Sequence, residues 1–227
     1  MNFKIILILL AVFTLSCGIS KKNTSSEKTT YKYLALGDSY TIGESVCDAC
    51  NYPTQLTDSL NKVLTEKTSL KIIAKTGWTT TDLLSAIAAE NSLKDNDLVT
   101  LLIGVNNQYQ GKLFSVYEEE FPKLLDMAIG FAKGKPKNVI VVSIPDYAFT
   151  PFGQKSGKAE KITSELKRYD AFAEKISKEK GVRFENITPI TQKGLENPDL
   201  VALDGLHPSD VAYKKFVEQL FSFAKIF

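Results

Sequence analysis

Five short apolar runs alternate with longer segments of helical character along the chain from Tyr31 onward. The apolar runs predict strands at 33–37, 70–74, 97–104, 138–144 and 182–186. Apolar spacing and capping residues predict helices at 52–67, 79–90, 116–133, 157–180 and 208–227. Strands that alternate with helices form right-handed βαβ crossovers and a parallel sheet. The sequence therefore predicts an α/β fold, a three-layer α/β/α sandwich around a five-stranded parallel sheet.

Composition limits the classes of partner that this fold can serve. The 227 residues are 44% hydrophobic and 24% charged, which is typical of a soluble domain, and no repeat or linker divides residues 31–227. The net charge is +2 and no long basic stripe is present, so a nucleic-acid partner is not expected. The chain has one histidine and scattered acids, so we expect no metal site and no cofactor.

The first thirty residues have the pattern of an export signal followed by a tether. Lys4 precedes an apolar run at 5–15, which is shorter than the roughly 20 residues that span a bilayer. Such a run is typical of a secretory signal, whereas a buried N-terminal helix would need an amphipathic pattern that does not follow. The segment TLSC resembles the cleavage box of bacterial lipoproteins, with Leu15 two places before Cys17. We therefore expect a signal peptide at 1–16, a lipidated Cys17, a flexible tether at 17–30, and an exported protein anchored to a bacterial membrane.

Polar residues and glycines follow the ends of the first three predicted strands. Ser39 follows the first strand, Gly77 the second and Asn106 the third, while Asp204 and His207 lie in the last loop. Each alone has an ordinary explanation as a turn, capping or surface residue. In a parallel sheet, however, the loops after successive strands emerge on one edge, so these residues are expected to meet.

Acyl transfer requires this set of residue types. A serine hydroxyl such as that of Ser39 needs a base to take its proton, and His207 can serve as that base. Asp204, three positions earlier, can hold the imidazole in the right tautomer. The N–H groups of Ser39 and Gly77 and the Asn106 amide can stabilise an oxyanion.

The order of these residues resembles the four blocks of the SGNH (GDSL-type) hydrolase family. GDSY, TGWTT, GVNN and DGLHPS stand for the blocks, with Tyr40 in place of the usual leucine and Asn107 in place of a common aspartate. The resemblance implies a flavodoxin-like fold, the catalytic residues Ser39, Asp204 and His207, and the oxyanion-hole donors Ser39, Gly77 and Asn106. GDSYT lacks the second glycine of the G-x-S-x-G elbow, because Thr41 occupies that position, which disfavours the α/β-hydrolase fold.

The resemblance implies a serine ester hydrolase that acts through an acyl-serine intermediate. Its substrate is expected to be a small-molecule ester, a lipid or thioester, or an acylated sugar. Aromatic and apolar residues near the predicted site suggest an apolar or sugar-stacking wall, with Tyr40, Trp78 and Tyr147 as the main candidates. Others in this group are Ile42, Tyr109, Phe149 and Phe152. A surface-anchored binding lipoprotein that keeps the fold without catalysis is the alternative function.

Cys47 and Cys50 form a C-x-x-C pair just after the serine block. Such a pair can be half of a zinc site, a redox motif, a local disulfide or two free thiols. Zinc needs further ligands, and a redox motif is expected to open a helix directly after a strand. Export favours a disulfide, which would stiffen the loop beside the site.

Overall fold

A computed structural model describes residues 30–224 of the chain. The predictions for the signal peptide, for Cys17 and for most of the tether fall on residues 1–29, outside the described residues. Among residues 30–224, no helix combines the length and the apolar character needed to cross a membrane.

The described residues form a five-stranded sheet in which all pairings are parallel, as predicted. The strand order is β2-β1-β3-β4-β5. The strands are β1 (Tyr31–Gly37), β2 (Thr68–Ala74), β3 (Leu98–Leu102), β4 (Val139–Val142) and β5 (Arg183–Glu185). All five residues of β3 are buried, as expected of a strand covered on both faces.

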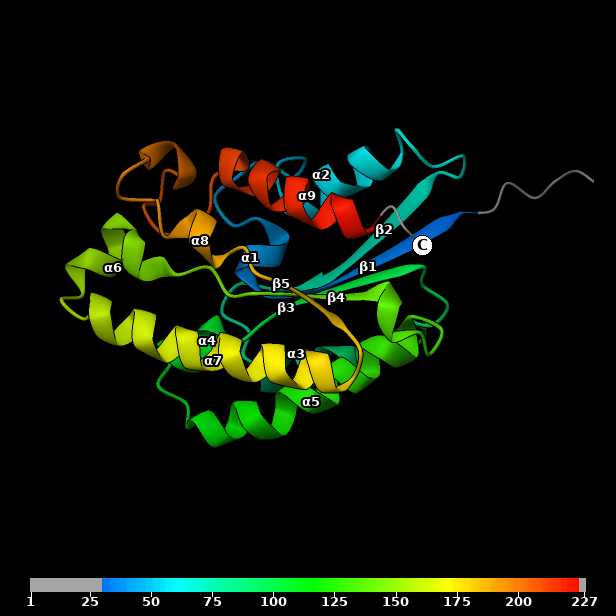
Figure 1. Cartoon of the computed structure of the whole chain (residues 1–227), viewed down its shortest axis with the longest axis horizontal. Coiled ribbons are helices and arrows are strands. Elements are labelled where there is room, and N and C mark those ends of the chain that lie inside the picture. The colour runs from blue at the N-terminus through cyan, green and yellow to red at the C-terminus, as the bar shows by residue number, and fades with distance from the viewer. Residues whose placement is uncertain (1–29, 225–227) are drawn as a thin grey trace, which may run out of the picture.

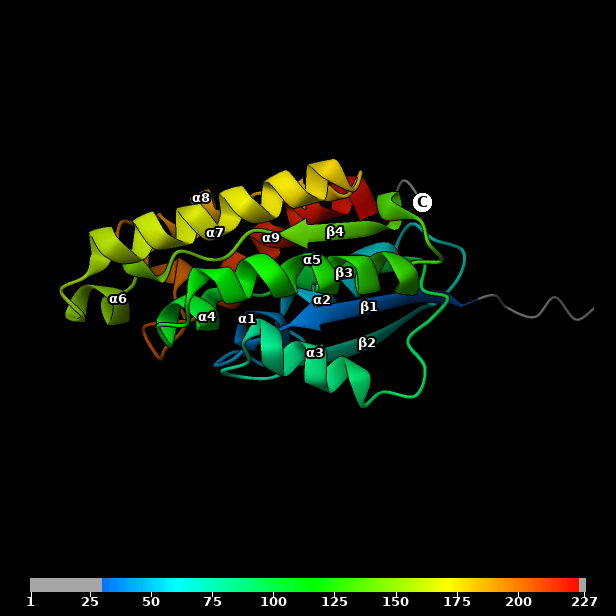
Figure 2. The same ribbon diagram turned by 90° about the horizontal axis from the view of Figure 1, so that it is seen from below.

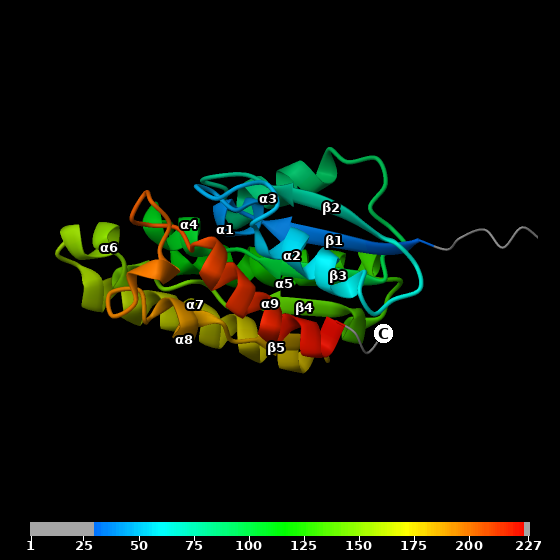
Figure 3. The ribbon, with the colours of Figure 1, turned by 90° about the horizontal axis from the view of Figure 1, so that it is seen from above.

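Helices cover both faces of this sheet and complete the three layers. α2 (Tyr52–Leu60) and α9 (Asp210–Ala224) lie on one face, the upper one in Figure 1 and the nearer one in Figure 3. The opposite face carries α3 (Thr80–Ala88), α5 (Phe114–Phe131) and α7 (Ala159–Glu179), which lie side by side in Figure 2. The predicted α/β/α sandwich is therefore confirmed.

Two of the long helices differ from the prediction at their ends. α2 ends at Leu60 rather than at residue 67, because the chain turns there and the Asn61 side chain accepts a hydrogen bond of 2.7 Å from the N–H of Thr68, at the start of β2. α9 begins at Asp210 rather than at 208, because Pro208 forms an isolated bridge with Val201.

The remaining long helices show smaller departures. α5 begins at Phe114 rather than at residue 116 and continues through Pro122. α3 follows the expected capping chemistry, since Thr79 and Asp82 form a reciprocal capping box.

Several short helices were not predicted, since four or five residues are too few to display a helical period. They are α1 (Ser39–Ile42), α4 (Val105–Tyr109), α6 (Pro151–Lys155) and α8 (Thr188–Thr191), with 3-10 turns at Pro136–Asn138, Tyr147–Phe149 (η2) and Pro198–Leu200. α1, α4 and α6 lie beyond the carboxyl ends of the strands, toward the left end of the molecule in Figure 2.

Buried tyrosines join the sheet to α2 through polar contacts inside the core. The hydroxyl groups of Tyr33 and Tyr52 both lie within hydrogen-bond distance of Thr100 Oγ1, at 2.9 and 3.2 Å. All three side chains are fully buried. The contact ties β1, β3 and α2 together just below the strand ends that carry the candidate site.

Candidate active site

The predicted site residues lie at the carboxyl ends of neighbouring strands. β1 pairs with both β2 and β3, so Gly37 lies opposite Ala74 on one side and Leu102 on the other. A Cβ atom on Gly37 would lie only 2.3 Å from the carbonyl oxygen of Leu102, so no larger residue fits without displacing this edge. The chain segments that carry Ser39, Gly77 and Asn106 therefore leave the sheet side by side.

Ser39 is the first residue of α1, and Asp38 caps that helix. The Asp38 side chain accepts a hydrogen bond of 3.0 Å from the N–H of Tyr40, and the Asp38 carbonyl accepts from the N–H groups of Thr41 and Ile42. Among the described residues, this leaves the N–H of Ser39 without a protein acceptor. Ser39 is only 5% exposed, so it is largely buried at the carboxyl edge of the sheet.

The Asp38 carboxyl is fully buried beside the nucleophile candidate. Burial raises its pKa to about 8, although hydrogen bonds from the N–H groups of Tyr40 and of Asp38 itself lower it. Its second oxygen, Oδ2, has no hydrogen-bond partner among the described residues. At neutral pH this carboxyl is therefore mainly protonated and adds little negative charge next to Ser39.

Asp204 and His207 form a local pair in the loop before α9. His207 Nδ1 lies 2.5 Å from Asp204 Oδ2, and Asp204 Oδ1 accepts from the N–H groups of Leu206 at 2.9 Å and His207 at 3.0 Å. Burial raises the pKa of Asp204, but these hydrogen bonds and one from Ser45 outweigh it and bring the pKa down to about 2. Asp204 is therefore ionised, with its orientation fixed by the turn that also carries His207.

Ser45 is a site neighbour that the sequence did not reveal. Its hydroxyl donates a hydrogen bond of 2.8 Å to Asp204 Oδ2, across 159 positions in the chain. Its φ is 68°, a left-handed conformation that is uncommon for a serine. No motif contains Ser45, and only the packing of the loop after α1 against the last loop brings the two residues together.

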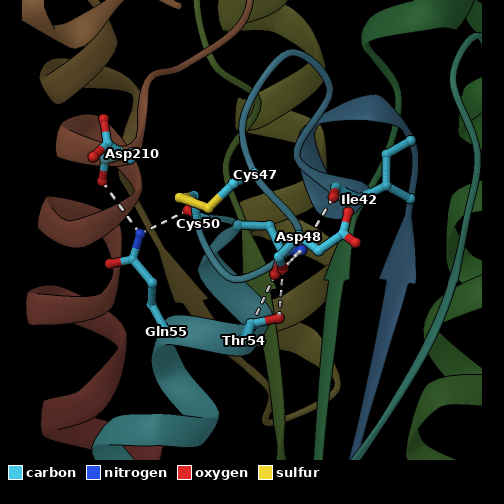
Figure 4. Close-up of a disulfide and its surroundings, with 8 residues drawn as sticks. Ile42, Cys47, Asp48, Cys50, Thr54, Gln55 and Asp210 are labelled. Atoms are coloured by element: carbon cyan, nitrogen blue, oxygen red, sulfur yellow. Dashed lines mark hydrogen bonds between the residues drawn. A yellow bond between two sulfur atoms is a disulfide. The ribbon is translucent and has the colours of Figure 1, made fainter.

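The loop that carries Ser45 contains a disulfide between Cys47 and Cys50, which was one of the four alternatives for this pair. Figure 4 shows how the start of α2 holds this loop: Gln55 Nε2 donates to the carbonyl oxygens of Cys50 and Asp210, at 2.6 and 3.2 Å. Thr54 Oγ1 donates to the carbonyl oxygen of Asp48 at 3.3 Å. The bridge and these hydrogen bonds together fix the lip of the site next to Ser45.

The residues after β2 and β3 meet through side-chain amides. Asn106 Nδ2 donates to the Trp78 carbonyl oxygen at 3.0 Å, which leaves its second N–H available. Gln110 Nε2 donates to the Gly77 carbonyl oxygen at 2.8 Å. Gly77 has φ +83°, a conformation that favours glycine. Gly77 and Asn106 are therefore held beside one another, as the prediction of an oxyanion hole requires.

Asn107 provides a second link between the same two loops. Its Oδ1 accepts from the Thr80 N–H at 2.9 Å, and its Nδ2 donates to Thr80 Oγ1 at 2.7 Å. An asparagine supplies both a donor and an acceptor here, where an aspartate would supply acceptors only. The departure from the common aspartate thus comes with a pair of hydrogen bonds to the start of α3.

Tyr40, the residue after Ser39, makes the contact with His207. The Tyr40 ring packs edge-on against the His207 ring, with 5.6 Å between centroids. No hydrogen bond joins Ser39 to His207 among the described residues. Nucleophile–base contacts in free hydrolases are often long and shorten once substrate is bound.

The predicted aromatic wall separates into buried and exposed members. Tyr40 and Tyr147 are buried, Trp78 is half-buried, and Tyr147 donates a hydrogen bond of 2.9 Å to Gln108 Oε1. Tyr109 and Phe152 are 57% and 37% exposed, whereas Ile42 and Phe149 are half-buried. Tyr40 and Tyr147 border a small cavity of about 10 Å³ beside His207. The structure thus offers exposed rings for ligand contact on α4 and α6 rather than next to His207.

Among residues 30–224, no cluster of three or more histidine, cysteine, aspartate or glutamate side chains could hold a metal ion. The arrangement instead combines an ionised acid, an imidazole, a hydroxyl and free N–H donors. These groups suit proton transfer and stabilisation of an oxyanion.

Comparisons with known proteins agree with this geometry. Residues 35–215 match the model of the GDSL-like lipase/acylhydrolase family. A search of curated protein sequences found no match.

Solved structures share the fold at low sequence identity. A variant of an acetyl xylan esterase from Geobacillus stearothermophilus is 18% identical, with a TM-score of 0.66 over 86% of this chain and 94% of that one. A lipase/acylhydrolase from Enterococcus faecalis is also 18% identical, with a TM-score of 0.66 over 86% and 95%. The psychrotrophic esterase EstA from Pseudoalteromonas sp. is 16% identical, with a TM-score of 0.63 over 86% and 97%. At these identities the likeness concerns the fold, while the family follows from the match over residues 35–215: the chain belongs to the GDSL-like lipase/acylhydrolase family and is an ester-hydrolysing enzyme.

Proposed function

We propose that this chain hydrolyses esters through an acyl-serine intermediate on Ser39, with His207 as the base and Asp204 as its orienting acid. The hydrogen bond of 2.5 Å between His207 Nδ1 and Asp204 Oδ2 is the observation that carries the proposal. It leaves Nε2 of the same ring as the nitrogen that can accept the serine proton. Ser39 supports the proposal through its place at the end of β1, one residue before the ring that packs on His207.

Each step uses groups that the chain itself provides. Ser39 Oγ attacks the ester carbonyl carbon while His207 Nε2 takes the hydroxyl proton. The tetrahedral oxyanion accepts hydrogen bonds from the N–H groups of Ser39 and Gly77 and from Asn106 Nδ2. Collapse expels the alcohol, which takes the proton from the imidazolium, and water then hydrolyses the acyl-serine with His207 again as base.

The buried Asp38 supports this chemistry as a neutral neighbour. A carboxylate there would repel the negative charge that develops on the substrate oxygen. The raised pKa of Asp38 keeps the carboxyl mainly protonated at neutral pH, so its role is to cap α1 through Tyr40. A protonated Asp38 can therefore cap α1 without placing a negative charge beside the developing oxyanion.

Two substrate classes are candidates for this ester hydrolase. Similar structures include an acetyl xylan esterase and a lipase/acylhydrolase, so short acyl groups on sugars and longer acyl groups on lipids are both candidates. We further propose, from the sequence of residues 1–30 alone, that the hydrolase domain is exported and tethered to a membrane through lipidated Cys17.

The experiment compares wild type with Ser39→Ala on p-nitrophenyl esters from acetyl to palmitoyl and on acetylated sugars. We expect Ser39→Ala and His207→Ala each to lose most of the activity while keeping the fold, because the two residues act as a unit. Asn106→Ala should cost about 2.7–4 kcal/mol of transition-state stabilisation, the usual cost of losing one oxyanion donor.

A fluorophosphonate that labels wild type at Ser39, read by peptide mass spectrometry, would report the nucleophile directly. His207→Ala is the sharpest control, because the chain has no other histidine to take over. Wild-type turnover in that variant, or labelling at another serine, would overturn the proposed mechanism.

A further inference from the structure

A large groove adjoins the candidate site on the side of α4, α6 and α7. Its volume is about 760 Å³. We call it the basic groove, after its five cationic lining residues: Lys112, Lys155, Lys158, Lys161 and Arg168. These residues come from the loop after α4, from α6 and the turn that follows it, and from the first half of α7, which lie at one end of the molecule in Figures 1 and 2.

The near end of the basic groove adjoins the residues proposed for catalysis but is not lined by them. α4 carries Asn106 and, within the next turn, Gln108 and Tyr109, which line the groove. Tyr147 lines the groove and also the small cavity beside His207. A substrate held in the groove therefore lies next to the residues proposed for catalysis.

Hydrogen bonds hold the groove wall in one arrangement. Tyr147 donates to Gln108 Oε1 at 2.9 Å, and Gln108 Nε2 donates to Glu165 Oε2 at 2.7 Å. Glu165 lies on α7, so this relay connects η2, α4 and α7. A wall built this way is preorganised, which lowers the entropic cost of binding.

Three aromatic rings form a ligand-sized surface at the near end. The ring centroids of Tyr109, Tyr147 and Phe152 lie 6.1 to 6.5 Å apart. Tyr109 is 57% exposed and Phe152 is 37% exposed, which is high for rings that contact one another. Such faces suit a sugar ring or a short apolar segment of a substrate.

The charge of the groove is strongly one-sided. Among the described residues that line it, Glu165 is the only acid, and it accepts a hydrogen bond from Gln108 and pairs with Lys161 at 3.7 Å. Within the described part of the chain, the other four cations form no ion pair. Arg168 is held in place by the Phe114 ring, with its guanidinium carbon 3.7 Å from the ring centroid.

A second lysine-lined hollow at the other end of the sheet provides a comparison. It contains Lys32, Lys133, Lys135 and Lys137, but also Glu66, Asp95 and Asp97. Lys133 pairs there with Asp97. The second hollow thus sets three acids against its four lysines, whereas the basic groove sets one acid against five cations. Because the whole chain carries only +2, the excess of positive charge in the basic groove is local.

We propose that the basic groove binds a carboxylate or phosphate on the non-reacting part of the substrate, so that the enzyme prefers anionic esters. The proposal rests on the ester hydrolysis proposed above and specifies its substrate. Lys158 and Lys161 lie four to seven residues before Glu165, which touches Gln108, and α7 rises about 1.5 Å per residue. The anionic group is therefore expected on the order of 10 Å from the α4 end of the groove.

The test measures kcat/KM on matched pairs of anionic and neutral esters. One pair is an acetylated uronic-acid oligosaccharide against its acetylated neutral counterpart. The other is an acylglycerol phosphate against the monoacylglycerol, so the two pairs separate a carboxylate from a phosphate source. We expect wild type to prefer the anionic member of at least one pair, and we expect about 1 M salt to abolish the preference, because screening then acts over about 3 Å.

Charge reversal supplies the matched variants. Lys155→Glu/Lys158→Glu should lower the anionic-to-neutral ratio of kcat/KM about tenfold, mainly through KM, since two exposed contacts become repulsive. Lys135→Glu/Lys137→Glu makes the same change of net charge at the other hollow and should leave the ratio as in wild type. Equal ratios in wild type and both variants, or equal losses in both variants, would overturn the proposal.

Binding separates this proposal from the proposed catalysis. Calorimetry of Ser39→Ala with the de-esterified anionic oligosaccharide and with glycerol phosphate needs no turnover. Binding that Lys155→Glu/Lys158→Glu removes, together with no ester turnover in wild type, would retain the groove and reject the mechanism. Turnover that depends on Ser39 without any preference for anionic substrates would retain the mechanism and reject the groove.

Discussion

Replacement of Asp38 by asparagine should make the protein more stable at neutral and alkaline pH. Asp38 is fully buried, and its Oδ1 accepts the N–H of Tyr40 while its Oδ2 has no partner among the described residues. An asparagine has the same shape and can keep the cap on α1 through its amide oxygen. The variant removes the possibility of ionisation, and it places an amide NH2 where Oδ2 has no partner, at a cost that does not depend on pH.

The size of the effect follows from proton linkage. Burial raises the pKa of Asp38 to about 8, so the folded protein binds this proton more tightly than the unfolded chain does. The stabilisation that results is complete below the unfolded pKa of about 4 and is lost as pH rises through about 8. Within that window each pH unit costs about 1.4 kcal/mol, so Asp38 should lower the free energy of unfolding by about 4 kcal/mol between pH 5 and 8. Asp38→Asn should lack this decline.

A second acid, the partly buried Asp170, sets the pH dependence of stability that should remain in Asp38→Asn. Burial raises its pKa to about 7, in spite of hydrogen bonds from the N–H of Ile144 and the hydroxyl of Thr188. Asp170 therefore also lowers the free energy of unfolding as pH rises, and its decline ends about one pH unit below that of Asp38. Asp38→Asn should keep the decline that Asp170 causes. In Asp38→Asn/Asp170→Asn, neither group should contribute to the pH dependence of the free energy of unfolding.

Urea unfolding at pH 5, 6, 7 and 8 measures these slopes, with the fluorescence of Trp78, the only tryptophan, as the probe. The difference in the free energy of unfolding between the two proteins should shift in favour of the variant by about 4 kcal/mol from pH 5 to pH 8. Asp58→Asn, at an exposed position on α2, is the control and should follow wild type. Parallel curves for wild type and Asp38→Asn would mean that Asp38 is ionised in the folded protein, and the reasoning would fail.

Three further predictions concern the loop after α1 and the N-terminus. Ser45→Ala should lower kcat/KM about fivefold, near 1 kcal/mol, because Asp204 Oδ2 loses one of two donors and is exposed enough for water to replace part of the bond; an unchanged kcat/KM would contradict a positioning role. Cys47→Ser/Cys50→Ser should change KM more than Tm, since closing so short a ring contributes only about 2 kcal/mol; a large fall in Tm at constant KM would exclude this. Cys17→Ser should release soluble protein or leave unprocessed precursor, and membrane fractionation unchanged from wild type, with no acyl mass on the mature N-terminus, would count against the lipid anchor.

The chain determines its layers through local periodicity. Apolar runs such as 97–104 predict β3, and the capping pattern at Thr79 and Asp82 predicts the start of α3, because burial and end-capping act over a few residues. The ends of helices were predicted less accurately. The spacing in 52–67 continues past Leu60, where the turn before β2, rather than helical periodicity, decides the conformation.

The sequence also predicted which residues of the candidate site come together. Asp204 and His207 lie three positions apart, so a single turn brings their side chains together, and the observed hydrogen bonds within that turn do so. The order of Ser39, Gly77 and Asn106 after consecutive strands predicts their meeting, because a parallel sheet delivers its loops to one edge.

Only the tertiary structure decided what surrounds these residues. Ser45 reaches Asp204 across 159 positions, Asp38 becomes an acid with a raised pKa by complete burial, and the basic groove collects cations from three separate elements. None of these has a sequence period, because each depends on the distance between elements that are remote in the chain. Sequence periodicity thus determined the sandwich and the strand edge on which the chemistry gathers, whereas packing of the loops and helices at that edge decided the charges, the hydrogen-bond partners and the space available to a substrate.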